Sequence, residues 1–112
     1  MYFPVMNIEQ FREYCLSFEE VTEVFPFGPG TLVYKVKGKI FALTDIDNFT
    51  SINLKCNPEL VIELRERYAA VLPGYHMNKV HWNTILMDNT ISDHLIREWI
   101  NHSYQLVKPT RQ

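Results

Sequence analysis

The stretch TLVYKVKGKIFALT, residues 31–44, is the part of the chain that decides the fold. Leu32, Tyr34 and Val36 recur at every second position, which is the period of a β-strand with one buried face. Gly38 supplies a tight turn, so that the second half of the stretch returns beside the first. The stretch therefore predicts a β-hairpin, and two strands joined by so short a turn must be antiparallel.

Sequence signals on both sides of the hairpin predict three helices and further strands. Asn7 is placed to cap a first helix, with Gln10 completing a capping box. Asn57 followed by Pro58 is a strong helix start, and Ser92 is placed to cap the last helix. In chain order we expect a helix from Ile8 to about Ser17, a strand at Val21–Phe25, the hairpin, a strand at Thr50–Cys56, a helix ending near Tyr68 or Ala70, a strand at about Asn78–Met87, and a helix after Ser92 with Leu95, Ile96, Trp99, Ile100, Leu106 and Val107 facing inward.

This order of elements predicts a two-layer α+β fold. An antiparallel sheet and three amphipathic helices bury their apolar sides only when the helices cover the sheet. The expected order is α-β(3-4)-α-β(1-2)-α, with an antiparallel sheet covered by helices. A chain of 112 residues has room for one hydrophobic core, so residues 1–112 are expected to form a single domain.

Charge is unevenly distributed along the chain. The formal net charge is −2 and the pI is about 6.0, so no overall basic field attracts nucleic acid. Residues 1–23 hold five Glu and one Arg, whereas the rest of the chain carries a net charge of +2. Any anion-binding surface is therefore expected outside the N-terminal segment.

The cysteines and the N-terminal sequence indicate a cytoplasmic protein. Cys15 and Cys56 each lie in an apolar pattern and are expected to be reduced and buried. The first residues lack the pattern of a signal peptide, and no apolar stretch is long enough for a membrane span. We expect a monomer with no membrane partner.

Catalytic motifs are absent from the sequence. There is no nucleophile elbow, phosphate-binding loop, dinucleotide fingerprint or zinc-protease motif. His76 and His81 have the chemistry of an acid–base pair and Cys56 that of a nucleophile, but Cys56 is predicted to face the core, where a thiol is inert. The sequence therefore favours a protein that is not an enzyme.

Metal binding is disfavoured for similar reasons. His94, Glu98 and His102 line one face of the last helix, at a spacing that can hold a metal ion. Because this face lies away from the apolar stripe, a solvated helix surface is the favoured interpretation. Asp45, Asp47 and Asn48 resemble the start of a calcium loop, but the Gly and the closing Glu are missing, so a turn is expected. We expect no metal and no cofactor.

The basic hairpin is the strongest candidate site. Lys35, Lys37 and Lys39 surround Gly38, so that two share a face and the third lies at the tip. Such lysines suit contact with phosphates, but lysines on exposed edge strands also block aggregation. The alternating patterns place further polar residues on one sheet face, opposite Ile52, Leu54, Val80 and Trp82; these residues are Asn53, Lys55, Lys79, His81 and Asn83.

Five segments of the chain occur together in an order that matches a known family. They are FPFG (25–28), YKVKGKIFAL (34–43), NLKCNPE (53–59), YHMNKVHW (75–82) and SYQLV (103–107). Over about residues 7 to 107 the chain resembles the MmcQ/YjbR family of small bacterial proteins. The resemblance implies an α+β fold related in shape to frataxin-like and secretion-chaperone-like domains. It also implies DNA binding by a double-wing arrangement, with Lys37, Gly38 and Lys39 at a wing tip. Asn78, Lys79, His81 and Trp82 lie on the family signature.

Three functional hypotheses follow. In the first, the protein binds DNA weakly and largely independently of sequence, through Lys35, Lys37, Lys39, Asn53, Lys55, Asn78, Lys79 and His81. In the second, it is a protein-interaction or adaptor module that offers a sheet edge or residues 75–83 to another polypeptide. In the third, His76 and His81 handle a small ligand or metal ion.

Overall fold

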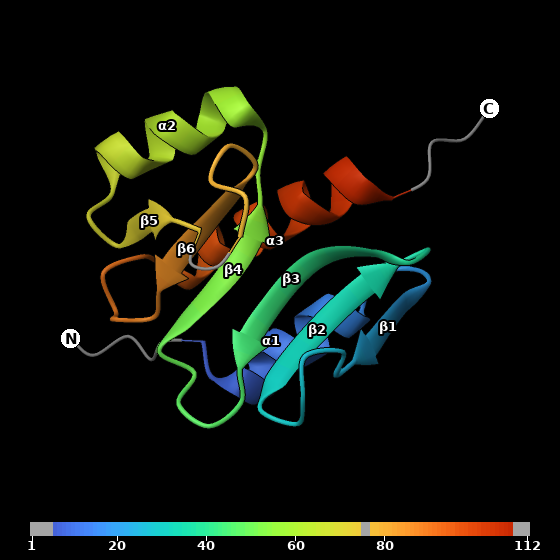
Figure 1. The fold of residues 1–112 in the computed structure, drawn as a ribbon. Helices are drawn as coiled ribbons and strands as arrows, with labels where there is room; N and C mark the ends of the chain where they lie inside the picture. Colours follow the sequence, from blue (N-terminus) through green and yellow to red (C-terminus); the bar gives the residue numbers. More distant parts are fainter. Residues whose placement is uncertain (1–5, 75–76, 109–112) are drawn as a thin grey trace.

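The computed structural model describes residues 6–74 and 77–108. Within these residues the chain forms three helices and a six-stranded sheet of order β1-β2-β3-β4-β6-β5, in which every neighbouring pair is antiparallel. The elements drawn in Figure 1 are α1 (Ile8–Leu16), β1 (Val21–Val24), β2 (Thr31–Val36), β3 (Lys39–Asp45), β4 (Ser51–Lys55), α2 (Pro58–Arg67), β5 (Val71–Pro73), β6 (Trp82–Leu86) and α3 (Asp93–Val107).

The predicted fold class is confirmed, because four strands separate α1 from α2 and two separate α2 from α3. The helices also begin where the capping patterns placed them. Asn7 Oδ1 accepts from the Gln10 N–H at 2.8 Å, and Gln10 Oε1 accepts from the Asn7 N–H at 2.9 Å. Asn57 and Ser92 accept backbone N–H groups from the first turns of α2 and α3. Local chemistry therefore decides where each helix starts.

Two strands differ from the prediction. The expected order allowed one or two strands between α2 and α3, but the position of β5 was not predicted. β5 has three residues and ends at Pro73, so it is too short to show an alternating pattern. β6 begins at Trp82 instead of about Asn78, because residues 79–81 form a turn. This change in the start of β6 alters which side chains of the segment face the helices.

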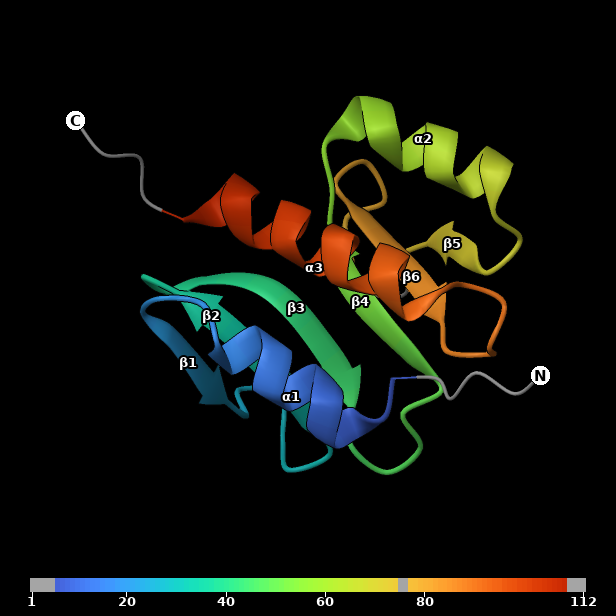
Figure 2. The same cartoon turned by 180° about the vertical axis from the view of Figure 1, so that it is seen from behind.

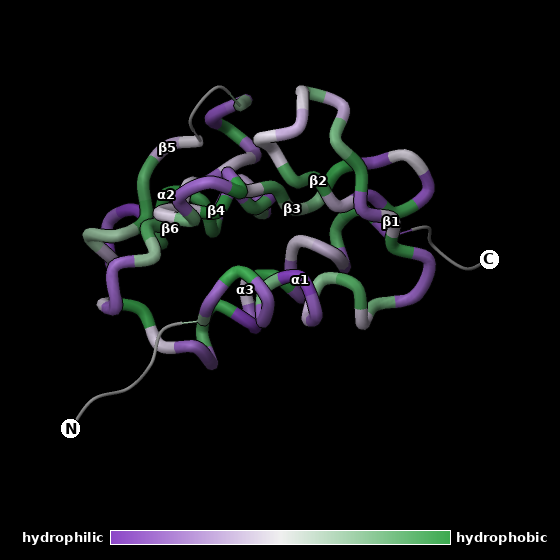
Figure 3. Tube along the Cα trace, turned by 90° about the horizontal axis from the view of Figure 1, so that it is seen from below, coloured by the Kyte–Doolittle hydropathy of each residue, from purple (hydrophilic) through white to green (hydrophobic). Residues whose placement is uncertain are grey.

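The two faces of the sheet have different surroundings. Helices α1 and α3 lie against one face, called here the covered face, which carries Leu32, Tyr34, Ile52, Leu54 and Ile85 (Figures 2 and 3). None of the described helices covers the opposite face, called here the open face, which carries Val33, Lys35, Leu43, Asn53 and Trp82.

The remaining helix, α2, lies beside β5 and β6, where the Tyr68 ring meets Trp99 of α3 at a centroid distance of 5.2 Å. At the end of α3 the buried stripe runs through Ser103, Tyr104 and Val107. Leu106 is 43% exposed, so its predicted inward position is wrong. No helix of the described residues combines the length and the apolar character needed to cross a membrane.

The sheet opens between β3 and β4, and α3 fills the opening (Figure 1). The two strands pair only from Ala42 to Thr44 on β3. Next to this short ladder, Ser103 Oγ donates to the Phe41 carbonyl at 2.5 Å and accepts from the Lys55 N–H at 2.9 Å. Ser103 is fully buried. Its hydroxyl group therefore bridges the two strands where they separate and satisfies both backbone groups.

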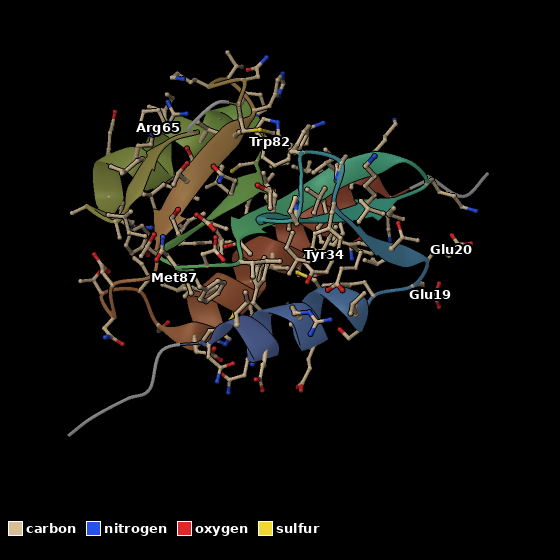
Figure 4. The ribbon with its side chains drawn as sticks, turned by 60° about the horizontal axis from the view of Figure 1, so that its bottom comes forward. Glu19, Glu20, Tyr34, Arg65, Trp82 and Met87 are labelled. Carbon is tan, nitrogen blue, oxygen red and sulfur yellow. The ribbon has the colours of Figure 1, made fainter. Side chains whose placement is uncertain are left out.

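A polar network on the covered face fastens α1 to β1 and β2. The buried Tyr34 hydroxyl donates to Glu23 Oε2 at 2.7 Å, and Arg12 donates to both Glu23 oxygens at 2.8 and 2.9 Å. Figure 4 shows Tyr34 between the sheet and α1. The hydrogen bonds from Arg12 lower the pKa of Glu23, while burial raises the pKa of Tyr34. Glu23 is therefore a carboxylate, and Tyr34 a neutral donor, at neutral pH.

Replacing Ser103 with Ala is expected to destabilise the protein by about 2–3 kcal/mol, because the Phe41 carbonyl and the Lys55 N–H lose their shared partner in a buried position. Urea unfolding measures this change. Ser17→Ala is the matched control, since Ser17 is exposed at the end of α1 and its loss should cost within about 0.5 kcal/mol. Equal costs for the two variants would contradict the bridging role of Ser103.

Glu23→Gln is expected to destabilise the protein at pH 7 and to have a smaller effect in acid. The folded-state pKa of Glu23 is below its ordinary 4.5, so its contribution is complete above that value and is lost as pH falls through the folded-state pKa. Urea unfolding of both proteins between pH 7 and pH 3 should show their stabilities converging below about 4.5. A gap that stays constant over this range would show that the charge of Glu23 contributes nothing.

Candidate functional site

The open face holds three of the predicted contact residues. Lys35 pairs with Ile40 across the hairpin, Asn53 pairs with Thr84, and Lys55 pairs with Trp82. These pairs place Lys35, Asn53 and Lys55 on the side that the helices leave uncovered. The alternation predicted for β4, with Asn53 and Lys55 opposite Ile52 and Leu54, is therefore confirmed.

A small apolar cluster lies among these polar residues. Val33, Leu43 and Trp82 are buried there, with Val24, Ile40 and Met77 packed against them. Trp82 and Val80 were predicted to anchor the sheet. The prediction is confirmed for Trp82, which is buried in this second cluster, and is wrong for Val80. Val80 is 59% exposed, because it lies in the turn before β6 instead of in a strand.

All six lysines lie on elements that reach the same end of the strands, which we call the lysine end. The tip of the β2–β3 hairpin lies on one side of the opening in the sheet, and the end of β4 and the turn before β6 lie on the other side (Figure 1). Acidic groups are also present, since Glu20 pairs with Lys37 at 3.1 Å and Glu19 lies beside it (Figure 4). The lysines of the lysine end are Lys35, Lys37, Lys39, Lys55, Lys79 and Lys108.

The three hairpin lysines point in different directions. Lys37 and Gly38 form the turn, with φ of 50° and 81°, and Lys39 pairs with Val36. Because a two-residue turn places residues three apart on the same face, Lys39 lies on the face opposite Lys35. The prediction that two of these lysines share a face is therefore wrong.

Edge protection does not explain Lys35. The edge strands of the sheet are β1 and β5, whereas Lys35 lies on β2 and pairs with Thr22 of β1 and Ile40 of β3. It has a neighbour on each side and does not protect an unpaired edge. Lys39 lies beyond the short β3–β4 ladder, so edge protection stays open for it. Contact of the hairpin with phosphates stays a prediction.

The turn before β6 uses its polar groups to hold its own shape. Asn78 Oδ1 accepts from the Val80 N–H at 2.8 Å, and Lys79 Nζ donates to the Gly74 carbonyl at 3.2 Å. The His81 carbonyl accepts from the Cys56 N–H at 2.7 Å. These contacts give the side chains of Asn78 and Lys79 structural roles, and His81 a backbone one.

Arg65 of α2 fastens this turn to the rest of the fold. Its Nε donates to Asn83 Oδ1 at 2.7 Å, and its Nη2 donates to the carbonyls of Lys79 and, at 3.1 Å, Trp82. Figure 4 shows Arg65 where α2 approaches β6. Asn83 was predicted to face outward, but it is buried on the covered face, and its Nδ2 donates to the Val61 carbonyl at 3.4 Å.

Sequence reasoning missed Arg65, because an arginine in an exposed-looking helix pattern gives no sign of its distant partners. The only related signal was the polar Asn83 beside a buried tryptophan, since a buried amide requires hydrogen-bonding partners. The planar guanidinium can serve several acceptors at once, which suits this role.

Within residues 6–74 and 77–108, the residues considered for catalysis or metal binding are not assembled into a site. Burial raises the pKa of the Cys56 thiol to about 11, which keeps it protonated and unreactive at neutral pH. His102 Nε2 accepts from the Asn57 N–H at 3.3 Å, while His94 lies beside Glu98 on the exposed face. Among the described residues, no group of three or more His, Cys, Asp or Glu could hold a metal ion. His76 and Tyr75 lie outside the described residues.

Comparison with known proteins identifies relatives across almost the whole chain. The family model described as YjbR matches residues 16–106. The Escherichia coli O157:H7 protein YbdF is 38% identical over 100 residues, covering 88% of this chain and 82% of YbdF. The YjbR protein of Escherichia coli K12 is 30% identical, covering 89% and 86%. The crystal structure of Deinococcus radiodurans protein DR2400 superposes with a TM-score of 0.87 at 37% identity, covering 96% of this chain and 82% of that one.

Replacing Arg65 with Met is expected to destabilise the protein by about 2 kcal/mol, because Asn83 Oδ1 loses its partner in a buried position. Amide hydrogen exchange should also accelerate in residues 79–83, which the guanidinium holds. Arg67→Met is the matched control, since Arg67 lies exposed in the same helix turn. The proposed role of Arg65 fails if exchange in residues 79–83 is the same in both variants.

Proposed function

The chain belongs to the YjbR family, and we propose that it is a non-enzymatic, cytoplasmic protein that binds the phosphate backbone of DNA through its lysine end. The observation that supports this proposal is that six lysines, from four separate parts of the chain, all lie at the same end of the strands. Lysine side chains contact phosphates as cations and need no metal ion or reactive group for this role.

The expected mode of contact follows from the shape of the lysine end. The β2–β3 hairpin carries Lys37 and Lys39 on its tip, and Lys35 and Lys55 lie on the open face beside it. A two-stranded element with cations on both faces can follow a groove while its lysines reach the phosphates on either side. The hairpin would then act as one wing of the contact.

The chemistry of this surface predicts weak binding without sequence selectivity. Bidentate reading of bases favours Arg, Asn or Gln side chains directed into a groove. Arg65 is committed to Asn83 and the turn before β6, and Asn53 Oδ1 accepts from the Thr84 hydroxyl at 2.6 Å. Lys37 also shares its charge with Glu20, and the net charge of the chain is −2. Phosphate contacts therefore supply most of the expected affinity.

Fluorescence anisotropy with a labelled DNA duplex tests the proposal. Binding should be detectable at low salt. If Lys35, Lys37, Lys39, Lys55 and Lys79 all contact phosphates, the logarithm of the association constant should fall against the logarithm of the salt concentration with a slope of about −4 to −5. The triple variant Lys35→Glu, Lys37→Glu, Lys39→Glu should abolish binding. A second duplex of unrelated sequence should bind about equally.

The matched control separates the lysine end from overall charge. Lys37→Glu and Arg67→Glu change the net charge equally, but Arg67 ends α2 beside β5, at the opposite end of the sheet. Lys37→Glu should weaken binding and reduce the salt slope by about one, whereas Arg67→Glu should leave affinity within about twofold. Absence of binding at low salt, or equal effects of the two variants, would overturn the proposal.

A further inference from the structure

A groove of about 690 Å³ lies on the open face, near the end of the sheet opposite the lysine end. It extends over the start of β2, the end of β3 and the first half of β4, beside the loop that precedes β2, and it reaches Met77 in the segment before β6. Its volume is in the range of pockets that bind ligands. The residues that line it are Phe27, Gly30, Thr31, Leu43, Thr44, Asp45, Asp47, Thr50, Ser51, Asn53 and Met77.

The lining of this groove combines three kinds of chemistry. Phe27 and Met77 provide apolar contacts, and Phe27 is 62% exposed, so its ring is accessible to a ligand in the groove. Strand residues such as Ser51 contribute hydroxyl groups. Asp45 and Asp47 contribute two carboxylates, and no lysine or arginine is among the described lining residues.

The turn that carries the two aspartates is held by local hydrogen bonds. Asp45 Oδ1 accepts from the Asp47 N–H at 3.0 Å, which confirms the predicted turn after β3. The Ile46 N–H donates to the Gly30 carbonyl at 2.9 Å, so this turn is fastened to the loop before β2. Both acidic side chains are therefore presented from a backbone fixed on two strands, and the groove is electronegative.

We propose that this groove binds an extended segment of a partner polypeptide, with a lysine or arginine of the segment against Asp45 and Asp47 and an apolar side chain against Phe27 and Met77. Charge complementarity selects a basic segment, since an isolated acidic rim attracts cations and repels phosphates. An exposed aromatic ring beside a polar rim is the usual composition of a protein contact. The site is separate from the lysine end and does not depend on the DNA-binding proposal.

The structure disfavours a second copy of the chain as the occupant. The lysine end of one molecule is complementary in charge to the groove of another, but these surfaces lie at opposite ends of the sheet. Such a head-to-tail contact does not close on itself unless a rotation forms a ring, and otherwise produces open filaments. We therefore assign the groove to a different polypeptide, and the experiment distinguishes the two cases.

The test uses a fluorescent nine-residue peptide that alternates valine with lysine and arginine, and a matched peptide with glutamate in place of each basic residue. The basic peptide should bind the full chain, and the glutamate peptide should not. Asp45→Asn with Asp47→Asn should weaken binding about tenfold at low salt, as expected from the loss of two exposed ion pairs. Phe27→Ala should also weaken binding several-fold, through lost apolar contact.

Two control variants make the result specific. Asp88→Asn removes one carboxylate from another exposed turn, where Asp88 accepts from the Thr90 N–H, and should leave peptide affinity unchanged. Lys37→Glu should not weaken peptide binding even if it abolishes DNA binding, so failure of one proposal is distinguishable from failure of the other. Chemical-shift mapping should show Thr31, Ser51 and Asn53 moving with the basic peptide.

Several outcomes would overturn the proposal. The first is that the basic peptide does not bind at millimolar concentration, and the second is that the glutamate peptide binds equally well. The third is that Asp88→Asn weakens binding as much as Asp45→Asn or Asp47→Asn alone. Spermidine that binds the groove as tightly as the peptide would instead indicate a small-cation site. Self-association that disappears in the Asp45→Asn, Asp47→Asn variant would identify a second copy as the occupant.

Discussion

The hydroxyl group of Ser103 is the contact on which the shape of the sheet depends. Strands β3 and β4 separate after a short ladder, and separated strands leave backbone groups that must find other partners. Ser103 supplies both partners at once, as donor to Phe41 and acceptor from Lys55, from inside α3. The helix can therefore enter the opening of the sheet without leaving a buried polar group unsatisfied. A larger or apolar side chain at this position would not permit the same approach.

This insertion has consequences for the surfaces of the molecule. Because α1 and α3 pack on the covered face, the open face keeps its apolar cluster around Trp82 and the groove near Asp45. The end of α3, where Lys108 is the C-cap, lies on the same side of the molecule as the hairpin tip (Figures 1 and 2). Basic and acidic surfaces are consequently at opposite ends of one sheet. Such a separation lets two partners of opposite charge bind without competing for the same residues.

The accuracy of the sequence predictions depends on how local each signal is. The caps at Asn7, Asn57 and Ser92 act within one helical turn, and all three were predicted correctly. The alternation of β4 also correctly predicted which side of that strand faces the helices. The segment before β6 failed, because its mixture of rings and polar groups resembles a strand but folds as a turn held by Arg65. That partner lies in another element and leaves no mark in the neighbouring sequence.

The amino-acid sequence alone was enough to predict the helix starts, the antiparallel hairpin, the α+β class and the family resemblance. These features depend on hydrogen bonds and side-chain periods that extend over a few residues. Four features were decided only by the tertiary structure. They are the buried position of Asn83, the second apolar cluster, the placement of the lysines at one end of the strands, and the acidic groove. Each of them joins residues from elements that are distant in the chain, and strand order and register, which set those distances, are determined by packing of the whole core.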